Sequence, residues 1–588
     1  MPDAPLASSP PAPLPVWARV GIAAVVLLPA VQLLEPAYGA RDPLQMAWFR
    51  WEQVLLSPQW AMVCALMGLG IAALVVAVVT EARAIPRRVW PGLLAVVGLA
   101  FVLRWMAPDA PHDINDRSIG AFHTPLLRAD YGWGLPSFMA TMLWLVPGVP
   151  QVQWTLYHFG PFLSALTAGM LVPLARALGG SWRVGLAAAG LFAVATPAVR
   201  FGHTDTHAIP ESLFFVAAVL AVLRFAAAPR WAPALAAGLW ASLALSMRPE
   251  GPLLALFLLG VASAVLSRGA WRHPALWAGL VAGGPATLAH VDAALHKLAV
   301  SESDRRTMSL FTEQGQINHA LFHEGPRHLL SFDPTYTHPW ISVLLLIGVL
   351  LGPVPRRTRL VLGALAIGLA LIVPGVHWTA AGGQPLVLAR HQLRAVPFVA
   401  LGVAFGLAWL FARLTNPVPR AAVTLATVAA ALAPLPLNYV PRTYAEEHRW
   451  AREALTQVPD GCVLLFRVPP GDWSLNLQYG ISSQIGRDHT WVAVNDGLPE
   501  PAECEFWYRS ANCSVVGDYD GRGVYAGLPR PGLDHCRDDE AALILEPVRE
   551  GLLPAAPYAY DDFAEEPVRV GVYRVLGRRP QPSVRPAP

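Results

Sequence analysis

The 588-residue chain has few charged residues: 14% are Asp, Glu, Lys or Arg, whereas 54% are hydrophobic. Soluble globular proteins carry about 25% charged residues, so the composition excludes an ordinary soluble enzyme. Lysine is almost absent, with Lys297 alone, and nearly all cations are therefore arginines. Together with abundant Ala, Pro and Gly, this bias indicates a GC-rich genome rather than a particular chemistry.

Nucleotide-binding signatures and cysteines are also scarce. The chain has no phosphate-binding loop, no GxGxxG motif and no internal repeat, which argues against a nucleotide-driven cytoplasmic enzyme. Among the five cysteines, Cys64 lies in an apolar segment, whereas Cys462, Cys504, Cys513 and Cys536 lie in the polar C-terminal part. This placement suits disulfides in an oxidising compartment.

Apolar runs of membrane-spanning length dominate the first three quarters of the chain. They occur near 16–34, 59–79, 88–106, 157–175, 184–199, 209–226, 231–247, 251–267, 275–296, 339–354, 359–374, 395–412 and 421–437. We therefore predict a polytopic α-helical membrane protein with about 13 transmembrane helices. Its transmembrane domain covers 16–437 and follows a disordered tail over 1–15. AYGA at 37–40 resembles a signal-peptide cleavage site, but Arg19 is the only charge close to the first run, and we favour a retained helix.

The distribution of arginine predicts the orientation. With the N-terminus in the cytoplasm, the inner loops hold one acid, Glu81, and the following arginines: Arg83, Arg87, Arg88, Arg176, Arg183, Arg224, Arg230, Arg268, Arg272, Arg356, Arg357, Arg359, Arg413 and Arg420. The acidic loops, including the two long outer loops 107–156 and 298–338, then lie outside. This arrangement requires that the short apolar stretch Pro136–Val146 does not span the membrane, and we expect an interfacial helix there.

The remaining residues, 438–588, form a predicted periplasmic α/β domain. We expect a helix over Tyr444–Thr456 and strands over Cys462–Val468, Trp491–Asn495, Ala542–Pro547 and Val568–Leu576. An odd number of spans places this domain outside the membrane. Its Cys504 and Cys513 could close a small loop, but four cysteines permit three pairings and the choice stays open.

Three groups of charged residues lie at the predicted outer surface. They are Asp113, Asp116 and Arg117 in the loop His112–Pro136; Arg200, His203, Asp205, His207 and Glu211 in the turn RFGHTDTHAIPE; and Arg248, Arg390, His391 and Arg394 near later helix ends. A carboxylate inside a span costs about 2.5–3.5 kcal/mol, a cost that charges at the surface mostly avoid. This placement suits a substrate at the interface better than an ion crossing the membrane.

Each group has a simpler explanation when taken alone. Asp116 could be a solvated loop charge or a helix cap, and Arg248 could cap a helix end or anchor at lipid head groups. The pattern His203-x-Asp205-x-His207 could chelate a divalent metal or be only a polar turn. The combination is more informative, because outer acids follow two different spans and outer arginines follow later ones.

This combination resembles the type-C glycosyltransferases (GT-C), polytopic enzymes that use polyprenyl-phosphate-linked sugars. The loop acids Asp113 and Asp116 match the acidic first outer loop of that superfamily, and Tyr131–Pro136 opens the interfacial helix that follows it. RFGHTDTHAIPESLFF, SMRPEGPLLAL and ARHQLRAVPFVAL resemble its second acidic loop, a basic outer segment and a late arginine-rich stretch. The overall pattern is most similar to the bacterial branch that contains protein O-mannosyltransferases and aminoarabinose transferases (families 39 and 83). The usual adjacent acidic pair is replaced by Asp113-Ile-Asn-Asp116, which leaves the key acid ambiguous.

The resemblance implies a hexosyl- or pentosyltransferase in the bacterial inner membrane. It would move a sugar from a polyprenyl phosphate to a lipid, glycan or protein acceptor on the outer face, with no nucleic-acid partner. Asp113, Asp116 and Asp205 are the expected catalytic acids. Arg248, Arg390, His391 and Arg394, with Arg117 and Arg200, are the expected substrate-binding residues.

Three alternatives stay open. HTDTH also resembles the DxD motif of oligosaccharyltransferases, so a divalent metal (Mg or Mn) at His203, Asp205 and His207 competes with our expectation of no cofactor. A transporter or flippase of a lipid-linked or anionic solute would need facing ionisable groups at mid-bilayer, for which His290 and Asp292 are the chief candidates. A non-catalytic assembly protein with an outer binding domain is the third.

Overall fold

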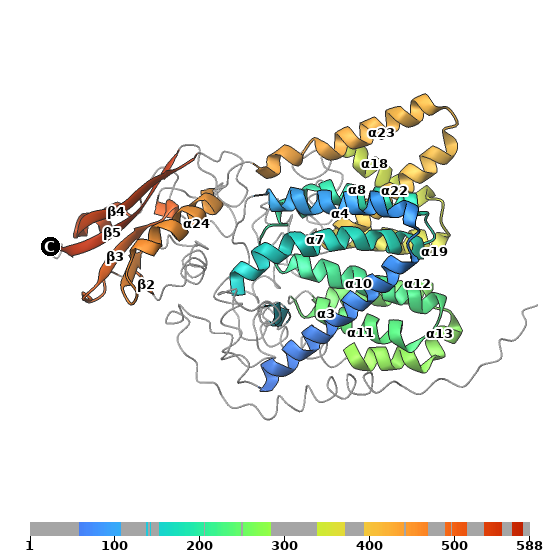
Figure 1. Ribbon diagram of the computed structural model, residues 1–588, viewed down its shortest axis with the longest axis horizontal. Coiled ribbons are helices and arrows are strands. Elements are labelled where there is room, and N and C mark those ends of the chain that lie inside the picture. Colours follow the sequence, from blue (N-terminus) through green and yellow to red (C-terminus); the bar gives the residue numbers. More distant parts are fainter. Residues whose placement is uncertain are drawn as a thin grey trace, which may run out of the picture.

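The computed structural model describes residues 58–107, 134, 137–138, 141–142, 152–204, 206–247, 251–283, 338–370, 393–439, 443–467, 489–494, 497–513, 534, 536–554 and 567–579. Figure 1 shows that they form two parts: a bundle of helices and, beyond one end of that bundle, a sheet formed near the C-terminus. The chain is thus a helical membrane protein with a C-terminal sheet region, as the sequence predicts at this level.

The described helices of the bundle overlap the predicted apolar runs, except the short helix α13, which lies between two of them. They are α3 (Pro58–Ala84), α4 (Trp90–Trp105), α7 (Val152–Ala177), α8 (Trp182–Val194), α9 (Thr196–Arg200), α10 (Ala208–Ala227), α11 (Trp231–Leu245), α12 (Gly251–Val265), α13 (Arg268–Arg272), α18 (Pro339–Leu351), α19 (Arg356–Gly363), α22 (Val396–Arg413) and α23 (Pro417–Leu432). A further apolar helix covers Pro274–Gly283. The predicted run 16–34 lies outside the described residues, so the count of about 13 spans stays a prediction.

The helices differ in how far they could reach across a bilayer. Among the described residues, five segments are long and apolar enough to cross a membrane alone: Cys64–Ala84, Arg87–Trp105, Phe159–Ala177, Ala208–Ala227 and Val396–Arg413. Helix α10 lies inside the bundle, because nearly all of its side chains are buried. The shorter helices, α8 and α11 among them, are equally apolar but have 13 and 15 residues.

Glycines set the closest helix contact in the bundle. Gly348 of α18 lies against the backbone of Gly402 and Gly406 of α22, and a Cβ atom at Gly348 would overlap the Gly402 carbonyl oxygen. Small residues four apart allow such contact between membrane helices, where packing replaces hydrophobic association. A side chain at Gly348 would therefore push α18 away from α22.

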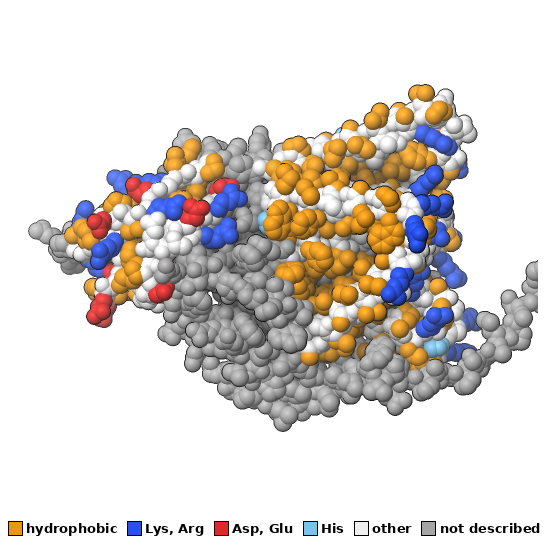
Figure 2. Space-filling model, viewed as in Figure 1, with side chains coloured by type: hydrophobic (Ala, Val, Ile, Leu, Met, Phe, Trp, Pro, Cys, Tyr) orange, Lys and Arg blue, Asp and Glu red, His pale blue; other side chains and the backbone are white. Residues whose placement is uncertain are grey.

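Arginines gather at the end of the bundle that lies away from the sheet. Figure 2 shows Lys and Arg side chains along that end and hydrophobic side chains over the flank of the helices. Most of them stand at helix ends, for example Arg87 and Arg88 before α4, Arg176 in the last turn of α7 and Arg413 at the end of α22. The acid expected here, Glu81, accepts hydrogen bonds of 2.8 and 2.5 Å from the Arg224 guanidinium. We refer to this surface as the basic end.

The C-terminal sheet has five strands in the order β2-β1-β3-β5-β4. The strands are β1 (Val463–Phe466), β2 (Thr490–Ala493), β3 (Glu505–Arg509), β4 (Leu543–Leu553) and β5 (Val568–Arg578). Strand β1 is parallel to both β2 and β3, whereas β5 is antiparallel to β3 and β4. Helix α24 (Thr443–Ala454) packs its buried alanines against the sheet, and the Tyr508 hydroxyl donates to Glu447 of this helix at 2.7 Å. The predicted helix and four predicted strands are confirmed, and β3 was not predicted.

The two disulfides differ from the small loop considered from the sequence. Cys462 pairs with Cys504, and Cys513 pairs with Cys536, so a Cys504–Cys513 pairing is wrong. Cys462 precedes β1 and Cys504 precedes β3, and the parallel register brings their Cα atoms to 4.9 Å. Cys504 precedes β3 and Cys513 follows it. The five residues of this strand span roughly 16 Å at about 3.3 Å each, a distance too long for one disulfide.

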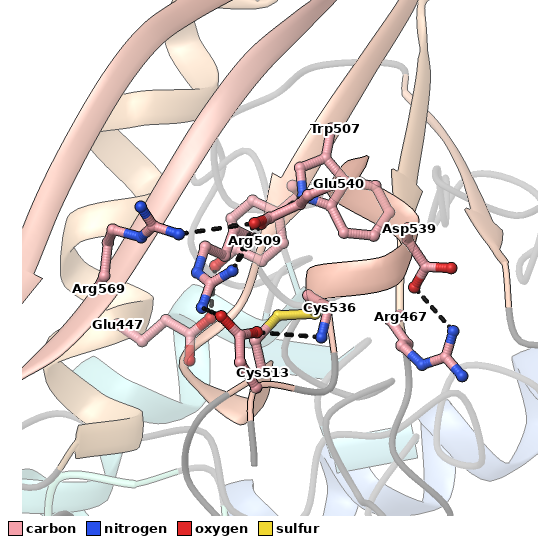
Figure 3. Close-up of a disulfide and its surroundings, with 11 residues drawn as sticks. Glu447, Arg467, Trp507, Arg509, Cys513, Cys536, Asp539, Glu540 and Arg569 are labelled. Carbon is pink, nitrogen blue, oxygen red and sulfur yellow. Dashed lines mark hydrogen bonds and ion pairs between the residues drawn. A yellow bond between two sulfur atoms is a disulfide. The ribbon is translucent and has the colours of Figure 1, made fainter. Parts of the chain in front are cut away.

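A charge network surrounds the Cys513–Cys536 disulfide (Figure 3). Arg509, at the end of β3, pairs with Glu540 at 2.7 Å and with Asp534 at 2.8 Å. Glu540 also accepts from the Trp507 indole at 3.1 Å, and Arg467 pairs with Asp539 at 2.7 Å. Burial raises the pKa of Asp539 above its ordinary value and outweighs the opposite effect of Arg467. The network joins α26 (Arg537–Ala542) to the sheet.

Candidate active site at the end of the bundle opposite the arginines

The site is built around a helix break that Arg104 stabilises. Helix α8 ends at Val194, Ala195 is extended, and Pro197 lies in the first turn of α9. Arg104, fully buried at the end of α4, donates to the carbonyls of Phe192 and Ala193 at 2.9 Å each, and the Phe192 carbonyl also accepts from the Ala195 amide. It also donates to Ser164 at 2.6 Å and stands over the Phe192 ring. The cation therefore replaces the hydrogen bonds that a continuous helix would make.

The first outer loop begins in contact with the second acidic turn. His203 stacks on Trp105 of α4 with ring centroids 5.4 Å apart, and its Nδ1 lies 3.0 Å from the Ala107 carbonyl oxygen. Gly202 allows this approach, because a Cβ atom there would collide with the Arg104 side chain. Ala107 precedes Asp113 by six residues and His203 precedes Asp205 by two. The structure thus joins the backbones that lead to two of the three predicted groups.

The second acidic turn also meets the late arginine segment. Arg394 Nε lies 2.8 Å from Glu211 Oε2 of α10, and Arg394 Nη2 lies 3.4 Å from His207 Nε2. The Ser212 hydroxyl donates to the Leu393 carbonyl at 3.3 Å. Glu211, Arg394 and His207 have exposed fractions of 0, 1 and 2%, so this ionic cluster is enclosed in the bundle. The Nε–H bond does not point at the carboxylate, so charge and proximity hold the pair.

A short helical stretch closes the site on a further side. Residues 134, 137, 138, 141 and 142 are helical; the last four lie within the predicted interfacial stretch Pro136–Val146, and 134 lies in Tyr131–Pro136, which was expected to open it. The Gly134 amide donates to the Ser246 carbonyl at 3.0 Å, and a Cβ atom at Gly134 would overlap Ser246, so only glycine fits this contact. Phe138 is buried edge-to-face against Phe214 of α10. The stretch therefore packs into the bundle beside the segment that leads to Arg248.

Many predicted site residues lie outside the described part of the chain. These are Asp113, Asp116, Arg117, Asp205, Arg248, Arg390 and His391. The described ones are Arg200, His203, His207 and Arg394; the first, third and last are buried, and His203 is partly exposed. What the structure brings together is pairs of segments at the end of the bundle opposite the basic end: residue 107 contacts 203, residues 207–212 contact 393–394, and residue 134 contacts 246.

The two histidines of HTDTH contact different partners and do not face one common position. His207 Nε2 faces the Arg394 guanidinium and the Glu211 carboxylate, which lies 3.7 Å away. His203 is held by Trp105 and the Ala107 carbonyl. Within the described residues, no group of three or more His, Cys, Asp or Glu side chains could hold a metal ion. The Arg394 guanidinium beside His207 adds positive charge to this cluster.

Sequence reasoning missed two residues of this site. Arg104 was read as part of a membrane span, although a charged residue at a span end is a signal for a polar partner. Glu211 was placed in the second group without a role, and the structure makes it the partner of Arg394. A small apolar cavity of about 80 Å³ also borders the site, lined by Pro197, Ile341, Ala395 and Val399 among others.

Comparisons with known proteins give matches to solved structures and none to protein families or curated sequences. No protein-family profile matches the chain, and no curated protein matches its sequence. The structure is similar to ArnT from Cupriavidus metallidurans bound to undecaprenyl phosphate, with a TM-score of 0.51 and 12% identity, over 83% of this chain and 97% of that one.

Two further solved structures match more weakly. The oligosaccharyltransferase from Archaeoglobus fulgidus gives a TM-score of 0.42 and 14% identity over 68% of this chain, which spans about 64% of that protein. The arabinofuranosyltransferase AftD from Mycobacteria gives 0.42 and 17% identity over 84% of this chain and 40% of that one. At 12% identity the similarity to ArnT shows a shared fold, and the chemistry must be argued from the site.

Proposed function

We propose that this chain, which has the type-C glycosyltransferase fold, transfers a sugar from a polyprenyl phosphate to an acceptor at the membrane surface. The main support is that the acidic segments and the segments that bear arginine come together at the end of the bundle opposite the basic end. ArnT, which has the same fold, was solved with undecaprenyl phosphate, and this supports a polyprenyl-phosphate donor here.

The proposed roles follow from the chemistry of the segments. Asp113 or Asp116 deprotonates or orients the acceptor hydroxyl, since a carboxylate within hydrogen-bond reach can take its proton. Arg248 and Arg390 hold the lipid phosphate, because guanidinium groups pair bidentately with phosphate oxygens and stay charged. The negative charge that develops on the leaving phosphate is stabilised by the same cations.

Arg394 has a double role in this proposal. Its Nε lies against Glu211, and its Nη1 has no hydrogen-bond partner within the described residues. A buried guanidinium donor of this kind suits one further acceptor, such as a phosphate oxygen. Glu211 then fixes the orientation of Arg394 while the remaining donor faces the substrate.

We propose that the transfer is independent of a metal ion. The support is the position of Arg394, which supplies a cation beside the buried carboxylate of Glu211 and beside His207. Treatment with EDTA is expected to leave the rate unchanged. Loss of transfer on chelation, with recovery on addition of Mg²⁺ or Mn²⁺, would instead make Asp205 a metal ligand.

The decisive experiment is a transfer assay on the full chain in lipid nanodiscs. Purified protein is incubated with radiolabelled polyprenyl-phosphate sugars and bacterial membrane acceptors, and label is followed into new products. Asp113→Asn and Asp116→Asn are tested singly, with the exposed C-terminal acid Asp538→Asn as the control. At least one loop variant should lose transfer while remaining folded, and Asp538→Asn should retain it.

Two outcomes contradict the proposal. Full transfer by both loop variants would remove this loop from the mechanism. Label that only changes leaflet in proteoliposomes, without a new product, would favour a transporter of the lipid-linked sugar.

A further inference from the structure

A second concave surface lies at the basic end, far along the bundle from the candidate active site. Helices α12 and α19 leave an open groove with a volume of about 400 Å³. The residues that line it are Leu256, Phe257, Gly260, Val261, Ala264, Leu360, Val361 and Ala364. All are apolar, and the volume falls within the range of about 300–1,000 Å³ that holds small ligands.

The groove is open because of two local features. Gly260 has no side chain, and a Cβ atom built there meets nothing within 4 Å. Helix α19 passes at Ala364 into a π-helical turn (Ala364–Gly368), whose Gly368 lies against the Phe257 ring. Such turns widen a helix locally and recur at functional sites.

Arginines stand at the mouth of the groove on both sides. Arg356 and Arg357 open α19, and Leu360 lies within about 6 Å of them along the helix axis at 1.5 Å per residue. On the other side, Arg268 follows the end of α12, three residues after Val265. All three are exposed, and no ion pair or hydrogen bond to their side chains is found within the described residues. Arg359, by contrast, donates to the Leu350 carbonyl of α18.

We propose that this groove binds an anionic phospholipid of the leaflet at the basic end. One acyl chain lies against the apolar lining between α12 and α19, and the phosphate lies between Arg356, Arg357 and Arg268. Charge complementarity favours this occupant, because the three exposed arginines lack an acidic partner within the described residues and Glu81 at this end is paired with Arg224. Basic pockets between membrane helices on the cytoplasmic side hold anionic head groups in this manner.

The proposal does not depend on the transfer reaction, since the groove and the candidate active site lie at opposite ends of the bundle. A functional consequence would be a fixed position of α12 and α19 in the leaflet. It is therefore tested by lipid retention rather than by activity.

The experiment is native mass spectrometry of the full chain released from nanodiscs of equal phosphatidylglycerol and phosphatidylcholine content. The wild-type chain should retain phosphatidylglycerol in preference to phosphatidylcholine. Replacement of both arginines (Arg356→Gln with Arg357→Gln) should weaken retention by on the order of tenfold or more, from the loss of two surface cations. Gly260→Phe should reduce it as well, because Gly260 lines the groove, a Cβ atom there meets nothing within 4 Å, and the added ring occupies space that the acyl chain would take.

Each variant has a matched control. Arg87→Gln with Arg88→Gln removes an exposed arginine pair at the same end, next to α4. Gly98→Phe adds the same ring at an exposed glycine of α4 that also has open space. Both controls should retain lipid as the wild type does. Equal losses in variants and controls, or equal retention of both phospholipids by the wild type, would overturn the proposal.

Discussion

Arg394 and Glu211 form an ion pair in the interior of the bundle, although one precedes α22 and the other lies in the first turn of α10. Their carboxylate–guanidinium separation is 2.8 Å, and neither side chain is exposed by more than 1%. Charges enclosed in this way are stable only while both are present, which makes the pair a sensitive point of the fold and of the proposed site.

Removal of the Glu211 charge should therefore be costly. We expect Glu211→Gln to lower the free energy of unfolding by about 3–5 kcal/mol, because it leaves a buried cation without its counter-charge. The control is Glu81→Gln in the pair with Arg224, whose side chains are 15 and 41% exposed and whose loss should cost about 1 kcal/mol or less. Thermal unfolding in detergent measures both. Equal effects of the two substitutions would contradict the enclosed character of the Arg394 pair.

Arg104 should be required for the helix break between α8 and α9, beside the start of the first outer loop. Arg104→Met removes the donors to Phe192, Ala193 and Ser164. The Phe192 carbonyl keeps its bond from the Ala195 amide, whereas a buried acceptor left without a partner, such as the Ala193 carbonyl, costs about 1–3 kcal/mol. We expect a large loss of stability together with loss of transfer. Gly202→Ala gives a second measurement, because its methyl group meets the Arg104 stem. Gly190→Ala, where a Cβ atom meets nothing within 4 Å, serves as control and should behave as wild type.

Peptide mapping should recover the two disulfides in the pairing seen here. Under non-reducing conditions, Cys462 should be linked to Cys504 and Cys513 to Cys536, while buried Cys64 is alkylated only after denaturation. The closed loops have sequence separations of 42 and 23 residues. Chain-entropy estimates then give about 4 and about 3.4 kcal/mol for the loss of each bridge. A Cys504–Cys513 peptide would contradict the β1–β3 register.

Reporter fusions test the proposed orientation. Fusions after Arg272 and Arg359 should report the cytoplasm, and one after Gly461 should report the outside, as expected from the concentration of arginine at one end. We propose accordingly that the sheet lies in the periplasm of a bacterium. A cytoplasmic signal from the Gly461 fusion would mean that the number of spans is wrong by one.

The stability of the sheet should depend on pH through Asp539. Because burial raises its folded pKa, its favourable contribution is present at pH values below the unfolded pKa and is lost as pH rises through the folded one. Asp539→Asn removes this dependence, so its stability relative to wild type should increase from pH 4 to pH 7. Hydrogen exchange of β4 and β5 peptides in the full chain measures the difference. A difference that falls from pH 4 to pH 7 would show that the Arg467 pair dominates, and an unchanged difference would show that folding does not shift the pKa of Asp539.

The helices could be predicted because each corresponds to one continuous apolar stretch of the sequence. Apolar length identified α3, α4, α10 and α22 directly, and the arginines identified their basic ends. Strand β3, in contrast, begins and ends with charged residues that are buried through pairs with distant ones: Glu505 with Arg578, and Arg509 with Glu540. Its sequence EFWYR therefore lacks the alternation that an exposed strand shows.

The candidate site was predictable as a set of segments and not as a set of contacts. The sequence places acids and arginines at the same membrane surface, and the structure brings their segments together through His203 and Arg394. The sequence could not indicate that Arg394 pairs with Glu211, because each of these residues has other charged neighbours along the chain. Nor could it indicate that Arg104 serves the carbonyls of α8, since that role exists only after α8 breaks at Ala195.

The strand order has a consequence for the time at which the C-terminal region can fold. Strand β5 is the last to be synthesised, yet it lies between β3 and β4, and β4 pairs with no other strand in the described sheet. The ribosome must therefore have completed residue 578 before β4 can join the sheet. The helical bundle has by then been made, so this region folds against a membrane domain already synthesised. A chain stopped before Val568 would present β4 as an unpaired edge, open to proteolysis and aggregation.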